Sequence, residues 1–325
     1  MIDNGMVLVL YIRSERCLDR TGNGKGVSFS FRYIKKEMVT TTEKEVLREK
    51  YDFIFPLGAA CSCTQVLRAA GLQYRSLPFD WLYGSNVVAR SQIVASGFET
   101  WLRKENMAHV GYFNLDEKRK LIYRNSLTGI IFNHDFLEGE EFDESFRKVS
   151  AKYNRRIERL LGAIRNSRTV LAVFLDSPDT AAIADDEELI AARRNLEAAF
   201  PGVKFNLLYL HNLDEVPYGE RRVESPGEGI LKLMYCYNAF NRRFPYQVDI
   251  PALALQLSVL RLSWRNLTRQ DVWQLIKNRC RFRRKRFQFR YLSRDGACGS
   301  SGDEQKELPG GGEEEAAAKS SCSAK

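Results

Sequence analysis

The chain has 325 residues, 44% of them hydrophobic, and a formal net charge of +9 at pH 7. A chain of this length can bury a sizeable core, either as one large domain or as one domain with appendages. The excess positive charge is concentrated in residues 277–291, which hold eight Lys or Arg and no acid, so the rest of the chain is close to neutral. This distribution argues against a basic nucleic-acid-binding surface across the whole fold.

Cysteine usage and hydropathy indicate the compartment. The seven cysteines follow no regular framework and form no CxxC pair, and the first residues carry no secretory signal. We therefore expect a reduced, cytoplasmic setting. The apolar stretch 253–262 is interrupted by Gln256 and Arg261 and falls short of the roughly 18 apolar residues that a membrane helix needs. We expect no transmembrane segment.

Residues 1–50 differ from the rest of the chain, and we interpret them as an N-terminal extension. Two β-rich runs, 6–13 and 27–35, flank a turn-forming DRTGNGKG stretch and predict a hairpin. The alternative is that translation begins at Met38, because the residues after it lead more naturally into the domain. The sequence leaves both interpretations open.

Strands alternate with helices in residues 51–224, which we interpret as the core domain. The expected elements, in chain order, are a strand at 52–58, a helix at 62–71, a strand at 126–133, a helix at 141–166, a strand at 168–176, a helix at 185–200 and a strand at 203–211. The strands are continuously apolar, as in sheets covered on both faces. The pattern predicts an α/β fold, with a mostly parallel sheet and helices on both of its faces.

The remainder of the chain is predicted to be helical over 225–292 and disordered over 293–325, where the apolar content is too low to fold. Thr268 and Asp271 suit the start of the last helix. The basic segment 277–291 interleaves aromatic residues with Arg, which is typical of binding to nucleic acid or to an anionic membrane surface. The protein would then be membrane-peripheral; the alternative is a solvated helix end.

Residues that can carry chemistry follow the expected strands. In an open parallel sheet, functional residues gather beyond the carboxyl ends of the strands. The residues found there are Gly58, Cys61, His134, Asp135, Asp176 and His211. Two of the three histidines of the chain belong to this set, which makes these positions a candidate site.

Cys61 lies in the stretch LGAACSC, at the mouth of an expected helix. A helix N-terminus and a nearby imidazolium both favour the thiolate, so this position suits a nucleophile. A histidine such as His134 would act as the base, oriented by a carboxylate, and backbone N–H groups from Ala60 to Ser62 would form an oxyanion hole. The alternative is that Cys61 is a small buried packing residue.

Metal and phosphate binding are further interpretations of the same stretch. Cys61 and Cys63 form a CxC pair that His134 or His211 would complete. Side chains two positions apart on a helix point to different faces, however, so we assign no metal site and expect no cofactor. A phosphate cradle at the helix start lacks the Lys of a Walker loop and the glycine spacing of a dinucleotide fingerprint.

Three blocks of sequence carry a resemblance to a family: DFIFPLGAACSCTQVLRAAGLQYRSLPFDWL at 52–82, FNHDF at 132–136 and KYNRRIERL at 152–160. In this order they resemble a bacterial family of unknown function that is described as "putative papain-like cysteine peptidases". The resemblance covers roughly 50–215, and its PFDW block is the most specific part because two aromatics framing an Asp after Pro rarely arise by chance.

The resemblance implies a thiol hydrolase or acyl-transfer enzyme that acts on a peptide, amide or ester. It implies Cys61 as the nucleophile and His134 as the base, with Asp80 favoured as the orienting group. Asp135 is the poorest orienter of His134, since adjacent side chains on a strand point to opposite faces. The expected binding residues around them are Gly58, Ser62, Trp81, Asp135, Asp176 and His211. The papain-like label also implies an α+β fold as the alternative to the α/β fold.

The second function that the sequence leaves open is not a peptidase. It is a module of bacterial surface-glycan assembly that binds an anionic or nucleotide-linked ligand at the strand ends and docks on a membrane through 277–291. The enzyme predicts His134 and an Asp within hydrogen-bonding reach of Cys61. The binding module predicts a buried or unpaired Cys61 and an open pocket lined by Arg.

Overall fold

The structure is a computed structural model that describes residues 13–16, 27–30, 41–99, 101–115, 118–176, 183–213, 215–216, 221–235 and 250–281. Most of the expected extension 1–50, residues 282–291 of the basic segment, residue 292 and the tail 293–325 lie outside the described residues. Of the expected hairpin, the structure describes one antiparallel strand pair, β1 (Arg13–Arg16) with β2 (Val27–Ser30).

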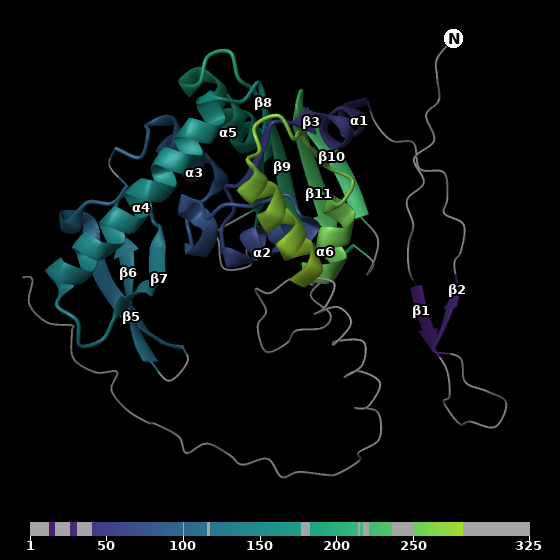
Figure 1. Ribbon diagram of the computed structural model, residues 1–325. Coiled ribbons are helices and arrows are strands. Elements are labelled where there is room, and N and C mark those ends of the chain that lie inside the picture. Colours follow the sequence, from purple (N-terminus) through teal and green to yellow (C-terminus); the bar gives the residue numbers. More distant parts are fainter. Residues whose placement is uncertain are drawn as a thin grey trace, which may run out of the picture. The chain divides into compact units, whose positions relative to one another are not determined.

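A five-stranded sheet organises the core, with the strand order β10-β11-β9-β8-β4 (Figure 1). Its strands are β4 (Phe53–Pro56), β8 (Thr169–Leu175), β9 (Lys204–Asn212), β10 (Arg221–Gly227) and β11 (Ile230–Tyr235). Neighbouring strands pair in parallel except for β10, which is antiparallel to β11 at the edge. The expected, mostly parallel sheet is therefore confirmed.

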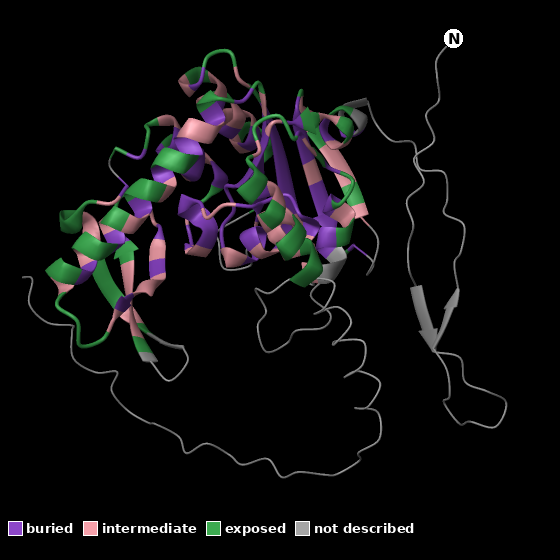
Figure 2. Ribbon diagram, in the orientation of Figure 1, coloured by how far each residue is buried: buried purple, intermediate pink, exposed green. Residues whose placement is uncertain are grey.

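Helices cover both faces of this sheet. The helices of one face are α3 (Val87–Ala95), α4 (Phe142–Arg165) and α5 (Asp186–Ala199). The helices of the other face are α1 (Thr41–Arg48), α2 (Cys61–Ala70) and α6 (Ile250–Leu257). Alternate side chains of a strand point to opposite faces, so β8 contributes Ala172 and Phe174 to one apolar core and Val173 and Leu175 to the other. Figure 2 shows the central strands as buried.

The α/β fold expected from the sequence is thus confirmed, and most elements of the core match. The expected helices at 62–71, 141–166 and 185–200 correspond to α2, α4 and α5, and the strands at 168–176 and 203–211 to β8 and β9. Helix α2 ends as expected at Gly71, which has a left-handed conformation with φ of 72°.

The strand expected at 126–133 is wrong in its position and its partners. Residues 126–129 form a turn, in which the Asn125 side chain accepts the N–H groups of Leu127 and Thr128 and Gly129 has a φ of 69°. The strand begins after this turn, as β7 (Ile131–Leu137), and does not join the parallel sheet. It pairs antiparallel with β6 (Lys118–Asn125), which pairs with β5 (Met107–Leu115). His134 and Asp135 therefore lie within a strand and not beyond its end.

The helical prediction for 225–292 is wrong over its first residues. Strands β10 and β11 occupy 221–235, joined by a two-residue turn in which Gly229 has a φ of 66°. The apolar run 230–235 is too short for periodicity to distinguish a buried strand from a helix. Beyond it the structure describes α6, then β12 (Arg261–Leu262), which pairs with β3 (Lys50–Tyr51), and helical residues 269–281.

Two short 3-10 helices, η1 (Pro78–Trp81) and η2 (Lys104–Asn106), complete the described elements. In the part of the chain that the structure describes, we find no helix that is both long and apolar enough to cross a membrane.

The turn between β4 and α2 depends on Gly58. A Cβ atom at this position would lie 2.8 Å from the Cys63 Cβ and 2.8 Å from the Leu175 backbone nitrogen. These distances are shorter than carbon atoms tolerate, and one of the two neighbours is backbone that cannot rotate away. A side chain at 58 would therefore push α2 away from β8.

We expect Gly58→Ala to lower the free energy of unfolding by about 1–3 kcal/mol, because the added methyl group overpacks the contact between α2 and β8. The measurement is equilibrium unfolding in urea, with Gly162→Ala as the matched control. Gly162 lies inside α4, and a Cβ there would meet no atom within 4 Å, so this variant should gain about 0.5–1 kcal/mol. Equal stability of the two variants would contradict the close packing at Gly58.

Candidate active site

The carboxyl ends of β4 and β8 form the most favourable place for a site. The two strands are neighbours, yet the chain leaves them on opposite faces of the sheet. After β4 it enters α2, which packs in one apolar core, and after β8 it leads to α5, which packs in the other. In open parallel sheets, ligands bind preferentially at the carboxyl edge between strands whose connections diverge in this way.

The backbone places Cys61 at this edge. Beyond the last residue of β4, Leu57 N–H donates to the Val173 oxygen at 2.8 Å and Ala59 N–H donates to the Leu175 oxygen at 3.1 Å. The segment leading to Cys61 therefore follows β8 to its end. On the other side of β8, Asp176 N–H donates to the Leu210 oxygen of β9 at 2.9 Å. Cys61, Asp176 and the end of β9 consequently lie along the same edge of the sheet.

Cys61 is the first residue of α2 and is half-buried. The N-cap, Ala60, has no side chain that could bond the first N–H groups of the helix. Burial raises the pKa of the Cys61 thiol, and hydrogen bonds from the N–H groups of Cys61 and Ser62 oppose this without cancelling it. The expectation of a helix-activated thiolate is thus incomplete: the resting group is a thiol, and it needs a base to become a nucleophile.

Cys63 is a packing residue. Its side chain is buried, and Sγ–H donates to the Val173 oxygen at 3.3 Å. Burial raises its pKa to about 12. Cys63 therefore lies under the turn while Cys61 is partly exposed, as the divergence of positions two apart on a helix predicts. Within the described ranges, no group of three or more His, Cys, Asp or Glu side chains could hold a metal ion.

His211 and Asp176 form a pair at the same edge of the sheet. His211 Nδ1 lies 3.1 Å from Asp176 Oδ2, and Tyr209 donates its hydroxyl hydrogen to the same oxygen at 2.8 Å. Both side chains of the pair are largely buried, with 13% and 8% of their surface exposed. An imidazole whose Nδ1–H is held by a carboxylate presents Nε2 as its basic nitrogen.

The predicted base, His134, lies on β7 of the antiparallel sheet. Its ring meets the edge of the Trp81 ring at 6.2 Å, and burial lowers its pKa against the opposing charge of Asp135. Asp135 accepts hydrogen bonds from the Tyr153 hydroxyl at 2.8 Å and from the Lys152 ammonium, both on α4. Through these two hydrogen bonds, Asp135 fixes β7 to α4.

The predicted orienting residue, Asp80, is fully buried and bonds to α2 and the segment after it. Its carboxylate accepts hydrogen bonds from Thr64 at 3.1 Å, Gln73 at 2.8 Å and Arg68 at 2.6 Å. Burial raises the pKa of Asp80, and the Arg68 guanidinium opposes that rise. The Arg68 guanidinium also lies 5.8 Å from the centre of the Trp81 ring. The contacts of Asp80 are those of a residue that holds α2 against η1.

Arg90, which was not predicted as a functional residue, is fully buried on α3. Its guanidinium donates to the carbonyl oxygens of five residues in two turns, namely Leu57, Gly58, Ala59, Leu82 and Gly84. Burial lowers the pKa of Arg90 to about 9. The sequence indicates the unusual role of Arg90 by its position on the same helix face as Val87 and Val94, where an apolar side chain is expected.

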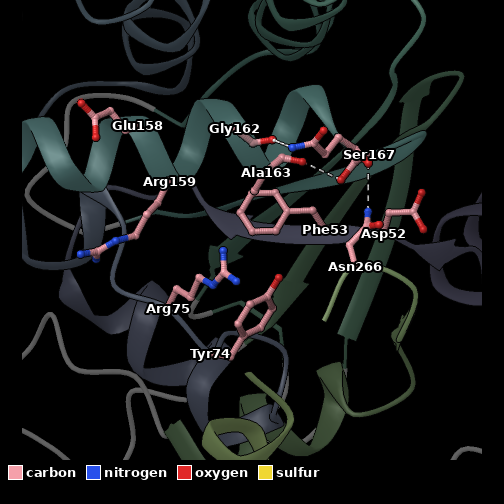
Figure 3. Close-up of a pocket in the computed structure, with 11 residues that line it drawn as sticks. Asp52, Phe53, Tyr74, Arg75, Glu158, Arg159, Gly162, Ala163, Ser167 and Asn266 are labelled. Atoms are coloured by element: carbon pink, nitrogen blue, oxygen red, sulfur yellow. Dashed lines mark hydrogen bonds between the residues drawn. The ribbon is translucent and has the colours of Figure 1, made fainter. Parts of the chain in front are cut away.

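A pocket of ≈ 270 Å³ lies at the other end of the strands, and Figure 3 shows the residues that line it. Asp52, which precedes β4, and Ser167, which precedes β8, line it together with Tyr74, Arg75 and Arg159. Cys61 follows the opposite end of β4, so this pocket does not belong to the candidate active site.

Comparisons with known proteins support, at a coarse level, a cysteine hydrolase. Residues 52–212 match the model of a family described as "Putative papain-like cysteine peptidase (DUF1796)". The match extends from β4 to β9 and includes Cys61, His134, Asp176 and His211. It agrees with the resemblance seen in the sequence over nearly the same residues.

One relative comes from Acanthamoeba polyphaga mimivirus and bears the name "Uncharacterized protein R408". It is 24% identical over 202 residues, which make up 57% of this chain and 89% of the relative. No solved structure matches the chain.

We expect Arg90→Met to lower the free energy of unfolding by at least about 3 kcal/mol, because each buried acceptor left without a donor costs about 1–3 kcal/mol. Arg90→Lys keeps the charge but not the planar fork of donors, so its loss should be smaller. Unfolding in urea measures both. Arg194→Met on the exposed side of α5 is the control and should change stability by less than about 0.5 kcal/mol. An Arg90→Met protein as stable as this control would contradict the carbonyl interactions.

We expect iodoacetamide to modify Cys61 slowly at neutral pH and faster only as the pH rises past the ordinary cysteine range, around 8.5. The reagent attacks the thiolate, and burial raises the pKa of Cys61. Mass spectrometry of the labelled peptides from pH 6 to pH 10 gives the profile, and the exposed Cys280 is the internal reference for reagent access. Fast modification of Cys61 at pH 6 would mean that the resting group is already a thiolate.

Proposed function

We propose that this chain is a cysteine-dependent hydrolase of acyl compounds in which Cys61 is the nucleophile and His211, oriented by Asp176, is the base. The observation that supports this proposal is the placement of Cys61 and the Asp176–His211 pair at one carboxyl edge, where the connections of β4 and β8 diverge. Strands β4 and β9 are two strand spacings apart, roughly 10 Å. Strand β8, which carries Asp176 just beyond its end, lies between them.

In the proposed reaction, His211 Nε2 takes the proton of the Cys61 thiol as the sulfur attacks the acyl carbon of an ester, thioester or amide. The tetrahedral oxyanion is stabilised at the start of α2, where Ala60 leaves the first N–H groups without a side-chain cap. The imidazolium then gives its proton to the departing alcohol, thiol or amine. Water, deprotonated by His211, hydrolyses the resulting thioester and restores the thiol.

The electrostatics of Cys61 favour a base-assisted mechanism. Because burial keeps the thiol protonated at neutral pH, the nucleophile forms only when a base accepts its proton. Asp176 stabilises the imidazolium that results, and the Tyr209 hydroxyl fixes the orientation of Asp176. The same arrangement keeps the free enzyme less reactive toward oxidants than a preformed thiolate would be.

The assignment of His134 as base and Asp80 as orienter is the second form of the same proposal. Asp80 already bonds to three side chains of α2 and the segment after it, so its carboxylate is engaged in these contacts. We propose that His134 and Trp81 take part in substrate binding. The setting in the cytoplasm and a partner for 277–291 remain predictions.

The alternative function, a module that binds an anionic ligand at the strand ends, draws support from one observation. The start of α2 has no side-chain cap, and the N–H groups of a helix start favour anions. In such a module, Cys61 would be a contact residue without covalent chemistry, and no acyl-enzyme would form.

We expect Cys61→Ala to abolish hydrolysis of 4-nitrophenyl acetate and, in acid-quenched wild-type protein, mass spectrometry to find the acetyl group on Cys61. His211→Asn should slow turnover about 10²–10⁴-fold, as loss of a general base does, and Asp176→Asn should shift the pH profile of the reaction. His134→Asn should retain turnover and raise KM.

The chain provides matched controls for this experiment. His109→Asn changes the third histidine, which is exposed on β5, and Cys280→Ala removes an exposed thiol; both should act like the wild type. If His134→Asn and not His211→Asn abolishes turnover, His134 is the base. Full turnover by Cys61→Ala, or no acyl-enzyme, would refute the hydrolase and leave the anion-binding module.

A further inference from the structure

The segment 255–281 exposes more large apolar side chains than any other described part of the chain. Trp264 and Trp273 expose 69% and 64% of their surface, and three aliphatic side chains of this segment are exposed as well, namely Leu255, Val259 and Ile276. Of the other exposed large apolar residues of the described chain, Val110, Tyr112 and Leu127 belong to the antiparallel sheet or its turns, and Ile183 precedes α5. Large exposed apolar patches mark sites of interaction with proteins or membranes.

The exposed charges of this segment all have the same sign. Its exposed cations are Arg261, Arg265, Arg269, Lys277, Arg279 and Arg281. The one acid between 255 and 281 is Asp271, which is buried and bonds to Arg75 at 2.7 Å and 2.8 Å. The exposed surface of the segment is therefore apolar and cationic, with no competing carboxylate.

The helical residues 269–281 place both kinds of side chain on one stripe. Arg269, Trp273, Ile276, Lys277 and Cys280 follow the three- and four-residue spacing of a helix face, and all are exposed. The inner side is fixed to the segment after α2: Asp271 bonds to Arg75, and Asn278 Nδ2 donates to the Gln73 oxygen at 3.0 Å. The stripe therefore faces outward, and Figure 2 shows the exposed colour on this helix.

We propose that this face, formed by residues 255–281, docks the protein on the surface of an anionic lipid bilayer. Tryptophan prefers the boundary between headgroups and acyl chains, aliphatic side chains gain from the apolar layer beneath it, and Arg and Lys bind the lipid phosphates. Each cation near an anionic surface contributes to the attraction. The helix lies in the interface and does not span it.

The aliphatic side chains favour a bilayer over a nucleic acid. Proteins bind single-stranded nucleic acids through aromatic rings on which the bases stack and through cations that contact the phosphates. Leu255, Val259 and Ile276 gain nothing from either contact, yet each has between 44% and 51% of its surface exposed. This inference does not depend on the proposed hydrolase.

The test uses the full chain with two kinds of vesicle, one of phosphatidylcholine alone and one with phosphatidylserine added. We expect co-sedimentation with the anionic vesicles and a blue shift of tryptophan emission, because Trp264 and Trp273 leave water. With excitation at an indole wavelength, the blue shift of the emission should be absent from the double variant Trp264→Phe/Trp273→Phe. Trp273→Ala/Ile276→Ala should lower the partition coefficient at least about tenfold. Lys277→Ala should lower it about fivefold.

Matched controls separate docking from general effects. Leu127→Ala removes an equally exposed leucine, 66% of its surface being accessible, and Arg155→Ala removes an exposed cation of α4; both should partition as the wild type does. Unchanged partition of Trp273→Ala/Ile276→Ala would overturn the proposal. So would equal binding to both vesicles, or binding to an RNA or DNA oligonucleotide without any binding to anionic vesicles.

Discussion

A single buried guanidinium holds the candidate site together. Arg90 reaches from α3 to the carbonyl oxygens of 57–59, which lead to Cys61, and to those of Leu82 and Gly84. Carbonyls in turns have no strand or helix partner, and a buried acceptor without a donor costs free energy. One planar group with five N–H donors satisfies several of them at once. The position of Cys61 thus depends on a residue of a different helix.

Three side chains of the PFDW block, those of Phe79, Asp80 and Trp81, each contact a neighbouring element. The Phe79 ring lies 5.0 Å from the Arg90 guanidinium, Asp80 bonds to α2, and Trp81 meets both Arg68 and His134. A buried carboxylate persists only where donors surround it, and Thr64, Gln73 and Arg68 meet that need. The most distinctive motif of the sequence therefore supports the geometry of the site and need not take part in proton transfer.

The sequence was sufficient where a pattern was long or ended in a strong signal. The apolar stripe of α4 and the strand-to-helix change at 58–61 predicted the right elements, whereas the six-residue run 230–235 was too short to distinguish strand from helix. His134 was expected beyond a strand end because the turn at Asn125 and Gly129 was not recognised. Asp176 and His211 were both expected in the site. Their pairing depends on β8 and β9 being neighbours in register, which the side chains of either strand alone do not specify.

The geometry of α2 relates the proposed catalytic edge to the proposed docking face. Cys61 begins this helix and Gly71 caps it, and a Cβ on Gly71 would lie within 3 Å of the Arg279 side chain. The ten residues of α2 span about 15 Å at 1.5 Å per residue. The helix that carries Arg279 therefore contacts α2 at the end remote from the thiol. A bilayer bound at the exposed side of that helix would lie nearer to the C-terminal end of α2 than to the thiol at its start.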